Sequence, residues 1–342
     1  MKKFSCLKAV QFVFVVSLCI TSLIAAVQAA GWNKVASPTS AFLESVDMVS
    51  SDDGWAVGAD GTIIRWDGTS WANVTSPITA HLRSVDMVSS TDGWAVGDDG
   101  TILRWDGTKW SNVTISGMWE SVDMVNSTDG WAVGLSGAIL QWNGTGWSRF
   151  ESPANYPLYS LDMVSSTEGW AVGQRGIIIG WDGTGWNTVK SPGLLGHRWL
   201  WSVDMVNSTD GWAVGDSGTI IRWDGTNWEY ASSPTTEHLF SVHMLDSTDG
   251  WAVGATGAII RWDGTSWTNA SSTTTAWLKS VDMVSPTDGW AVGADGIIIH
   301  WQEEAPDFTI GYLIIISAVA VVVVVWFLRK KTVLSNQLLS VS

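Results

Sequence analysis

The segment GWAVG occurs seven times, and this repetition constrains the fold more than any other feature of the sequence. Its tryptophan stands at positions 55, 94, 131, 170, 212, 251 and 290, so the period is close to 40 residues. A second tryptophan ends the apolar run that follows, at positions 66, 105, 142, 181, 223, 262 and 301. Periods of this length are typical of solenoids and propellers, in which each repeat is one supersecondary unit.

Each copy has the pattern of four short β-strands. Residues 45–49 (SVDMV) alternate polar and apolar side chains, and the runs 55–58 (WAVG) and 62–66 (TIIRW) are rich in β-branched and aromatic residues. The Asp67-Gly68 pair predicts a hairpin turn into a fourth strand at 70–74. Because no helical pattern interrupts these strands, one copy matches one propeller blade.

A third repeated tryptophan indicates how the array closes. It begins the fourth strand of six copies, at positions 71, 110, 147, 186, 228 and 267. The seventh copy ends at Trp301 without this strand, whereas residues 31–38 (GWNKVASP) resemble it. Pairing the two would remove both free sheet edges of the array. The predicted fold class is therefore all-β, a seven-bladed β-propeller closed by its N-terminal strand.

The three sets of tryptophans predict a core between the blades. Each large aromatic side chain buries ~150–250 Å² when it packs, which would supply a core without disulfides or metal. An aromatic platform for carbohydrate is the alternative interpretation of the same residues.

Two apolar segments flank the repeats. Residues 1–29 place lysines before an apolar run, as in a secretory signal peptide, although an uncleaved N-terminal anchor has the same pattern. Residues 310–328 carry no charge and span a bilayer core at ~1.5 Å per helical residue, and basic residues follow them. The predicted order is a signal peptide at 1–29, a propeller ectodomain at 30–302, a linker at 303–309, a transmembrane helix at 310–328 and a cytoplasmic tail at 329–342. We therefore expect a single-pass protein of the cell membrane with its propeller outside.

Charge and cysteine content exclude several functions. All 33 acidic residues but only 12 of the 18 basic ones lie between the two apolar segments, so this part carries a net charge of −21. Such a surface repels phosphate backbones, and nucleic acid is not expected as a partner. Both cysteines, Cys6 and Cys19, lie in the signal peptide, which leaves the mature chain without disulfides or thiolate chemistry. We expect no cofactor, no metal and a monomeric propeller.

Variation among the copies concentrates in two connections, the entry to the first strand and the loop between the second and third strands. In an up-and-down blade these two connections lie on the same side of the ring. Aromatic and charged residues at such positions suit a protein or glycan partner, and drift in solvent-exposed loops is the alternative. The predicted ligand-binding residues of this upper face are Phe42, Glu44, His81, Arg83, Trp119, Glu120, Tyr159, Arg175, Trp199, Trp201, His238, Phe240, Trp277 and Lys279.

Possible N-glycosylation sites avoid this face. Three sequons fall on predicted fourth strands and three in turns of the lower side, where the chain also leaves the last blade toward the membrane. Chance sequons in a chain rich in Ser, Thr and Asn are the alternative. The asparagines are Asn73, Asn112, Asn126, Asn143, Asn207 and Asn269.

The predicted inner strands repeat an acidic position near the axis of the ring. A ring of carboxylates there could hold a hydrated cation, or each side chain could bond to neighbouring backbone or indole groups. If the carboxylates converge, mutual repulsion would raise their pKa values. The residues are Asp47, Asp86, Asp123, Asp162, Asp204, His243 and Asp282.

The GWAVG element followed by WDGT resembles the repeats of the photosystem II stability and assembly factor family, and more broadly the Asp-box (BNR) propellers, over residues 31–302. The resemblance implies a propeller fold. Sialidases of the Asp-box group use three arginines with a tyrosine nucleophile and acidic partners, and the residues here that could share one face in that way are Arg83, Arg175, Arg198, Tyr159 and Glu120.

The expected function is a non-catalytic binding, adhesion or scaffold module that holds a protein or glycan on the upper face. Two alternatives stay open at this point: an assembly or stability factor for a membrane protein complex, and a sialidase-like glycoside hydrolase.

Overall fold

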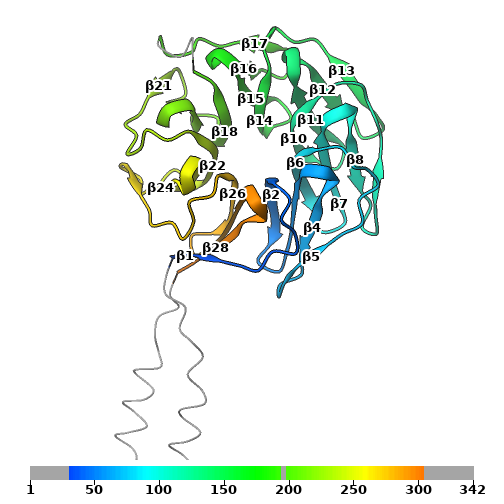
Figure 1. Ribbon diagram of the computed structural model, residues 1–342. Helices are drawn as coiled ribbons and strands as arrows, with labels where there is room; N and C mark the ends of the chain where they lie inside the picture. Colours follow the sequence, from blue (N-terminus) through cyan, green and yellow to red (C-terminus); the bar gives the residue numbers. More distant parts are fainter. Residues whose placement is uncertain (1–30, 194–197, 304–342) are drawn as a thin grey trace, which may run out of the picture. The chain divides into compact units, whose positions relative to one another are not determined.

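The computed structural model describes residues 31–193 and 198–303, and within them the chain forms seven four-stranded antiparallel sheets. The sheets are arranged as blades around a central axis (Figure 1), and Gly31–Gln302 form one compact unit. The predicted all-β, seven-bladed propeller is confirmed.

Every blade has the same four-strand order from the axis to the rim. In the first blade the strands are β2 (Leu43–Ser50), β3 (Asp53–Gly58), β4 (Ile63–Trp66) and β5 (Trp71–Asn73). The next blades are β6 (Leu82–Ser89), β7 (Asp92–Gly97), β8 (Ile102–Trp105) and β9 (Trp110–Asn112); β10 (Trp119–Asn126), β11 (Asp129–Gly134), β12 (Ile139–Trp142) and β13 (Trp147–Phe150); β14 (Leu158–Ser165), β15 (Glu168–Gly173), β16 (Ile178–Trp181) and β17 (Trp186–Thr188). The last blades are β18 (Leu200–Asn207), β19 (Asp210–Gly215), β20 (Ile220–Trp223) and β21 (Trp228–Tyr230); β22 (Leu239–Asp246), β23 (Asp249–Gly254), β24 (Ile259–Trp262) and β25 (Trp267–Asn269); and β26 (Leu278–Ser285), β27 (Asp288–Gly293) and β28 (Ile298–Gln302) with β1 (Gly31–Lys34).

The seventh blade is closed by the two ends of the propeller. Its strand order is β1-β28-β27-β26, and β1 pairs antiparallel with β28 so that Trp32 lies opposite Trp301 and Gly31 opposite Gln302. Trp32 is buried and packs edge-on against Trp251 of the preceding blade at 5.4 Å between ring centroids. The predicted closure by the N-terminal strand is therefore confirmed.

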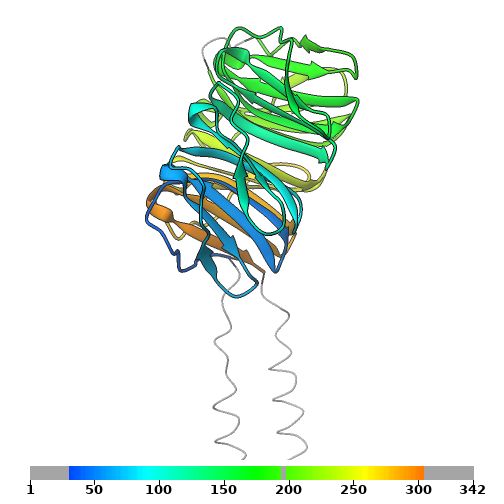
Figure 2. The ribbon, with the colours of Figure 1, turned by 90° about the vertical axis from the view of Figure 1, so that its right-hand side faces the viewer.

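A short 3-10 turn joins the second and third strands of each blade, and these turns gather at one edge of the ring (Figure 2). We call this side of the ring the upper face, and the opposite edge is the side of the ring that carries the other turns. Each turn is tied to the entry of the first strand, as where the Ala59 N–H donates to the Phe42 carbonyl at 2.8 Å. The two variable connections thus lie together. The turns are η1 (Ala59–Gly61), η2 (Asp98–Gly100), η3 (Leu135–Gly137), η4 (Gln174–Gly176), η6 (Asp216–Gly218), η7 (Ala255–Gly257) and η8 (Ala294–Gly296).

The repeated tryptophans form the core between the blades. Trp55 of the first blade contacts Trp105 of the second at 4.7 Å and meets Trp110 edge to face at 5.3 Å and 86°. All three are almost completely buried, and the same trio recurs at the other junctions. Because these rings face one another, they serve packing, and they form no platform for a carbohydrate.

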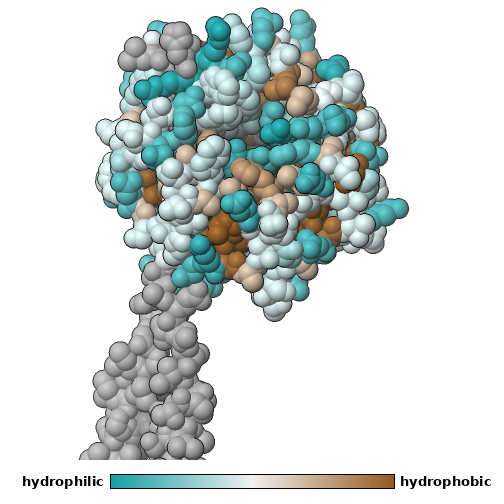
Figure 3. Space-filling view, viewed as in Figure 1, coloured by the Kyte–Doolittle hydropathy of each residue, from teal (hydrophilic) through white to brown (hydrophobic). Residues whose placement is uncertain are grey.

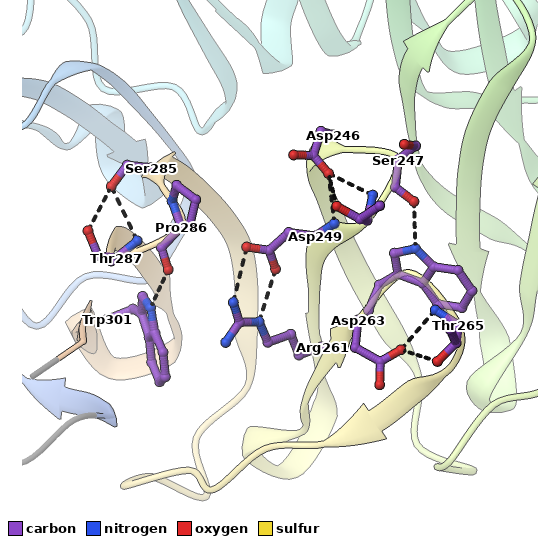
Figure 4. Close-up of polar contacts among 12 residues, drawn as sticks. Asp246, Ser247, Asp249, Arg261, Asp263, Thr265, Ser285, Pro286, Thr287 and Trp301 are labelled. Carbon is purple, nitrogen blue, oxygen red and sulfur yellow. Dashed lines mark hydrogen bonds and ion pairs between the residues drawn. The ribbon is translucent and has the colours of Figure 1, made fainter.

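The turns on the opposite side of the ring vary little, and several of their residues have structural partners. Asp249 holds Arg261 through two hydrogen bonds, and Trp262 donates its indole N–H to the Ser247 carbonyl at 3.0 Å. Asp263 accepts from both the N–H and the hydroxyl of Thr265 and so closes the hairpin (Figure 4). The same contacts recur in most blades, so these residues belong to the scaffold.

Two predicted segments lie outside the described residues. They are the signal peptide at 1–29 and, beyond Glu303, the rest of the linker with the helix and tail that follow it. Within residues 31–193 and 198–303, no helix is long and apolar enough to cross a membrane.

Candidate functional site at the mouth of the ring

Each inner strand carries a β-bulge at its upper end. In the first blade Leu43 lies opposite Gly58 and Ser45 opposite Val57, which leaves Glu44 without a partner. Bulges re-aim a side chain and are frequent beside functional sites. A Cβ on Gly58 would lie 2.0 Å from the Phe42 carbonyl oxygen, so the invariant glycine is needed where the bulged strand approaches.

The seven bulge residues form the candidate site, and we call them the mouth residues. Their identity changes from blade to blade although the residues on either side hardly vary. Viewed along the axis, hydrophilic and hydrophobic residues lie side by side around the centre of the ring (Figure 3). The mouth residues are Glu44, Arg83, Glu120, Tyr159, Trp201, Phe240 and Lys279.

One side of the mouth, on the first three blades, is ionic. Glu44 accepts a hydrogen bond from His81 at 3.0 Å, and Arg83 binds the carboxylate of Asp98 through two nitrogens at 3.1 and 3.3 Å. Burial alone would raise the pKa of Glu44, but the His81 hydrogen bond and the charges of Lys279 and Arg83 bring this pKa below its ordinary value. Glu44 therefore stays ionised within the network.

The other side, on the fourth to seventh blades, is aromatic. Tyr159 stacks on Trp201 with ring centroids 4.6 Å apart, and Trp201 meets Phe240 edge to face at 6.1 Å. Trp199 packs against Tyr159 and Trp201, and Trp277, which is 50% exposed, lies 5.6 Å from Phe240. An aromatic surface thus continues across four blades, with polar neighbours at its margin.

Lys279 joins the two sides. Its ammonium lies 4.5 Å from the centroid of Phe240 and 5.9 Å from that of Trp201, within cation–π range of both. The same nitrogen is 3.4 Å from a carboxylate oxygen of Glu44. The mouth residues of neighbouring blades therefore contact one another across the seam between the seventh and first blades.

Glu120 differs from the other charged mouth residues. Within the described part of the chain, no hydrogen bond or close ion pair reaches its carboxylate. Burial raises its pKa, the Arg83 charge opposes this, and the Asp98 and Glu44 charges add to it. Burial, with a smaller effect of the Glu120 charge, also raises the pKa of Tyr159 to about 12.

One predicted upper-face residue is misplaced. Trp119 is fully buried, and its indole N–H donates to the Ile115 carbonyl at 3.0 Å. It occupies the core position that leucine fills in the other blades, so it cannot present itself to a ligand. Its neighbour Met118, 37% exposed, is the true equivalent of Phe42, and aligning Trp119 with Leu43 would have shown this.

The remaining upper-face residues lie around the mouth. Arg175 is exposed, has a left-handed φ of 60° and stacks over the half-exposed Tyr156, which the sequence did not single out. His238 is exposed and lies 3.0 Å from Asp216, whose carboxylate also accepts the Trp201 indole N–H at 2.8 Å. The sequence had not predicted that Asp216 orders this side of the mouth.

The arginines that a sialidase would need have separate partners. Arg83 pairs with Asp98, Arg175 lies over Tyr156, and Arg198 donates to the Thr219 hydroxyl at 2.8 Å. No contact that the structure shows for residues 31–193 and 198–303 brings the three guanidinium groups onto one anion.

The acidic ring near the axis links the blades. The Met87 N–H donates to the carboxylate of Asp47 at 2.7 Å, and the adjacent Val85 N–H donates to the Ser45 hydroxyl at 3.2 Å. Inner strands have a free edge, and these bonds satisfy its amides. The hydroxyl bond recurs at all seven junctions and the carboxylate bond at six of them. The alternative of bonds to neighbouring backbone is therefore confirmed.

The remaining position of this ring is His243, which pairs with Asp282 at 2.9 Å. Burial, and after it the charge of neighbouring carboxylates, raises the pKa of Asp86 well above its usual range and that of Asp162 likewise. Burial also raises the pKa of Asp123 to about 7. Burial lowers the pKa of His243, but the Asp282 charge and hydrogen bond outweigh it and bring the pKa to about 9. The expected mutual repulsion is thus present.

The closed ring and its variable mouth define the class of the protein. It is a seven-bladed β-propeller with a surface of charged and aromatic side chains at one end of its axis. Solved structures of the same architecture include YCF48 bound to D1 peptide, with a TM-score of 0.68 and 20% identity over 82% of this chain and 99% of that one. YCF48 from Cyanidioschyzon merolae gives a TM-score of 0.66 and 19% identity over 80% and 99% of the two chains. The WD40 propeller domain of Doa1 gives 0.68 and 15% over 80% and 98%.

These likenesses show the fold. They bear out the fold-level resemblance to the photosystem II assembly factor repeats that the GWAVG motif indicates. No protein-family model matches the chain, and no curated protein sequence matches it.

Proposed function

We propose that this chain is a non-catalytic binding propeller, a scaffold or adhesion module that holds a protein partner at the mouth residues. The observation that carries the proposal is the contrast between the mouth and the rest of each blade. Seven bulge side chains differ from blade to blade, while the turns of the other edge keep the same partners. A half-exposed aromatic surface bordered by charged groups is the composition of a protein-binding hot spot.

The proposed setting is the cell surface. It is supported by the leader-like residues 1–29, the apolar residues 310–328 and the basic residues after them. The six sequon asparagines are exposed and none is a mouth residue, so glycans on them would leave the mouth free. Because β28 ends at the edge opposite the upper face, a C-terminal anchor would direct the mouth away from the lipid.

A second candidate is an assembly factor for a membrane protein complex. A specific observation favours it: one propeller with the same fold is solved as "YCF48 bound to D1 peptide". At 20% identity this likeness transfers no binding residue, so the partner has to be found by experiment.

Site-specific photo-cross-linking in the full-length chain tests the proposal. A benzophenone amino acid at Phe240 reports on the mouth, and one at the exposed Ser70 in the β4–β5 turn reports on the opposite edge. We expect a defined protein adduct from position 240 and none from 70 in the membranes of the native host. Identical adducts from both positions, or only glycan adducts from position 240, would refute a protein partner at the mouth. Membrane-enzyme subunits in the adduct would favour the assembly-factor candidate.

A further inference from the structure

The mouth contains one cation site that the chain fills with its own side chain. The Lys279 ammonium lies over the face of Phe240 at 4.5 Å and 3.4 Å from the Glu44 carboxylate. A cation between an aromatic face and a carboxylate gains from both the ring quadrupole and the opposite charge. The bulges place these three residues on the seventh, sixth and first blades, so the arrangement is made by neighbours around the ring.

The same combination recurs on the third to fifth blades without a cation. Glu120 occupies the bulge of β10, Tyr159 that of β14 and Trp201 that of β18, which are consecutive inner strands. Tyr159 and Trp201 form a stacked pair. Among the described residues, Glu120 has neither a hydrogen bond nor a close ion pair. The charges of Arg83 and Lys279 act on it without direct contact, and these two cations form their close ion pairs with Asp98 and Glu44.

Two further observations favour a cationic ligand here. The region between the two apolar segments carries 33 acidic and 12 basic residues, so the surrounding field attracts positive charge and repels an anion. Asp216 is already committed, since its carboxylate accepts the Trp201 indole N–H and the Trp199 backbone N–H and thereby fixes the Trp201 ring. The aromatic wall is therefore ordered before any ligand arrives.

We propose that Glu120, Tyr159 and Trp201 form a binding site for a lysine or arginine side chain of the protein partner. This inference rests on the proposed function, because the cation is delivered by a segment of that partner lying across the mouth. The ammonium or guanidinium group lies against the faces of Tyr159 and Trp201 and pairs with the Glu120 carboxylate. Lys279 with Phe240 and Glu44 is the internal counterpart of the site.

Fluorine NMR of the full-length chain tests the site directly. The sequence has only four tyrosines, so labelling with 3-fluorotyrosine gives few resonances, and Tyr159→Phe assigns the one of interest. The probe is the capped pentapeptide Gly-Gly-Lys-Gly-Gly or its arginine form, with norleucine in place of lysine as the neutral control, at constant salt. We expect both cationic peptides to shift the Tyr159 resonance in a saturable way and the norleucine peptide to leave it unchanged. The Tyr230 resonance, from β21 at the rim, should not move.

Two matched variants decide the role of the carboxylate. Glu120→Gln keeps the shape of the side chain and removes its charge, and we expect it to weaken binding of the lysine peptide at least fivefold. Asp60→Asn removes one charge from η1 on the same face, in a left-handed conformation that asparagine adopts easily, and we expect less than a twofold change. Unchanged Tyr230 resonances show that each variant is folded.

Equal shifts with the norleucine peptide, or equal affinity of Glu120→Gln and the parent chain, would overturn the site. Binding of tetramethylammonium more tightly than the lysine peptide would assign it to small cations and overturn the protein source. If the Tyr159 resonance does not shift with the cationic peptides but a protein adduct forms at position 240, this inference is overturned and the proposed function still holds. A responding Tyr159 without any adduct would show that Glu120, Tyr159 and Trp201 bind a cationic side chain, but it would overturn both the proposed function and the assignment of that side chain to a protein partner.

Discussion

The carboxylate of Asp47 accepts a hydrogen bond from the backbone N–H of Met87, 40 residues further along the chain and in the next blade. The bond joins two inner strands that share no sheet. Equivalent bonds occur around the ring, so the Ser-x-Asp motif of six inner strands links one blade to the following one, and in the sixth blade His243 takes the place of the aspartate. The stability of the propeller therefore depends on acidic groups that also repel one another.

Asparagine and alanine separate these two effects at Asp162. Asp162→Asn keeps an oxygen for the Met205 N–H, now 2.8 Å from the carboxylate, and removes one buried charge. We expect it to raise the melting temperature at pH 8 and to change little at pH 5. Asp162→Ala leaves that N–H without its partner and should cost about 1–3 kcal/mol at pH 5. Melting curves of both variants at the two pH values are the measurement. An alanine variant that is more stable than the parent at pH 5 would contradict a stabilising role for the hydrogen bond between Met205 and Asp162.

The ring also sets the pH dependence of stability. A carboxyl group whose pKa rises on folding contributes stability that is complete at pH values below its pKa in the unfolded chain. This contribution is lost as pH rises through its pKa in the folded protein, which is about 7 for Asp123. His243 has the same sign: its contribution is present below its ordinary pKa of 6.5 and lost as pH rises through about 9. The groups whose pKa rises are Asp47, Asp86, Asp123, Asp162, Asp204 and His243.

The exposed turn carboxylates act at the other end of the pH range. The side-chain hydrogen bond from Thr108 lowers the pKa of Asp106 to about 2, so its contribution is lost only as pH falls through that value. We therefore expect the melting temperature to be highest in mildly acidic buffer, at about pH 4–6, and to fall steadily toward pH 9. A calorimetric pH series with a maximum above neutrality would show that the ring does not dominate.

Replacing the one histidine of the ring sharpens this test. His243→Asp removes the cation that pairs with Asp282 and adds a carboxylate between Asp204 and Asp282. We expect a larger loss of melting temperature at pH 8 than at pH 5, because raised carboxyl pKa values, about 7 for Asp123, reduce the negative charge of the ring at the lower pH. His243→Asn, which adds no charge, is the control, and an equal loss at both pH values would contradict the electrostatic explanation.

Two glycines form a matched pair for the mouth. A Cβ at Gly58 would lie 2.0 Å from the Phe42 carbonyl oxygen, whereas at Gly146 it would meet nothing within 4 Å. Gly58→Ala should therefore destabilise the protein by more than ~2 kcal/mol, and Gly146→Ala should stay within ~0.5 kcal/mol of the parent. Denaturant titration measures both, and a neutral Gly58→Ala would mean that the bulge adapts more easily than its geometry indicates.

Closure of the ring can be tested at Trp32. This fully buried residue of β1 packs against Trp251 and Trp301, and removal of so large a side chain typically costs ~3–5 kcal/mol. Trp32→Ala should lower the melting temperature strongly, whereas Trp32→Phe should recover part of the loss. A melting temperature that is insensitive to both would show that the seventh blade is stable without β1.

The repeat period and the offset of the third tryptophan were sufficient to predict the blades and their closure, because both are spacings that can be counted directly in the sequence. The bulge at Glu44 was beyond such reading, since it appears only in the pairing register of β2 with β3. Trp119 was assigned to the surface because its side chain suggested a binding residue, although its place in the repeat is a core position.

Contacts between blades were also hard to foresee. The partner of Asp47 is a backbone amide, and amides carry no sequence signal, so the sequence could favour local hydrogen bonds in general but could not identify the Met87 N–H in the next blade. The clustering of Tyr159 with Trp201 depends on the order of blades around the ring, which the sequence does supply, and on the side-chain direction set by the bulge, which it does not.

The pairing of Gly31 with Gln302 makes the N-terminal boundary of the propeller unusually sharp. Proteolysis that removes only residues before Gly31 would leave the pairing of β1 with β28 complete. A cut after Lys34 would remove the rim strand of the seventh blade, expose the edge of β28 and uncover the tryptophans beneath it. The pairing of β1 with β28 thus sets a limit on any shortening of the chain from its N-terminal side: a chain that keeps Gly31–Lys34 keeps the four-stranded seventh blade.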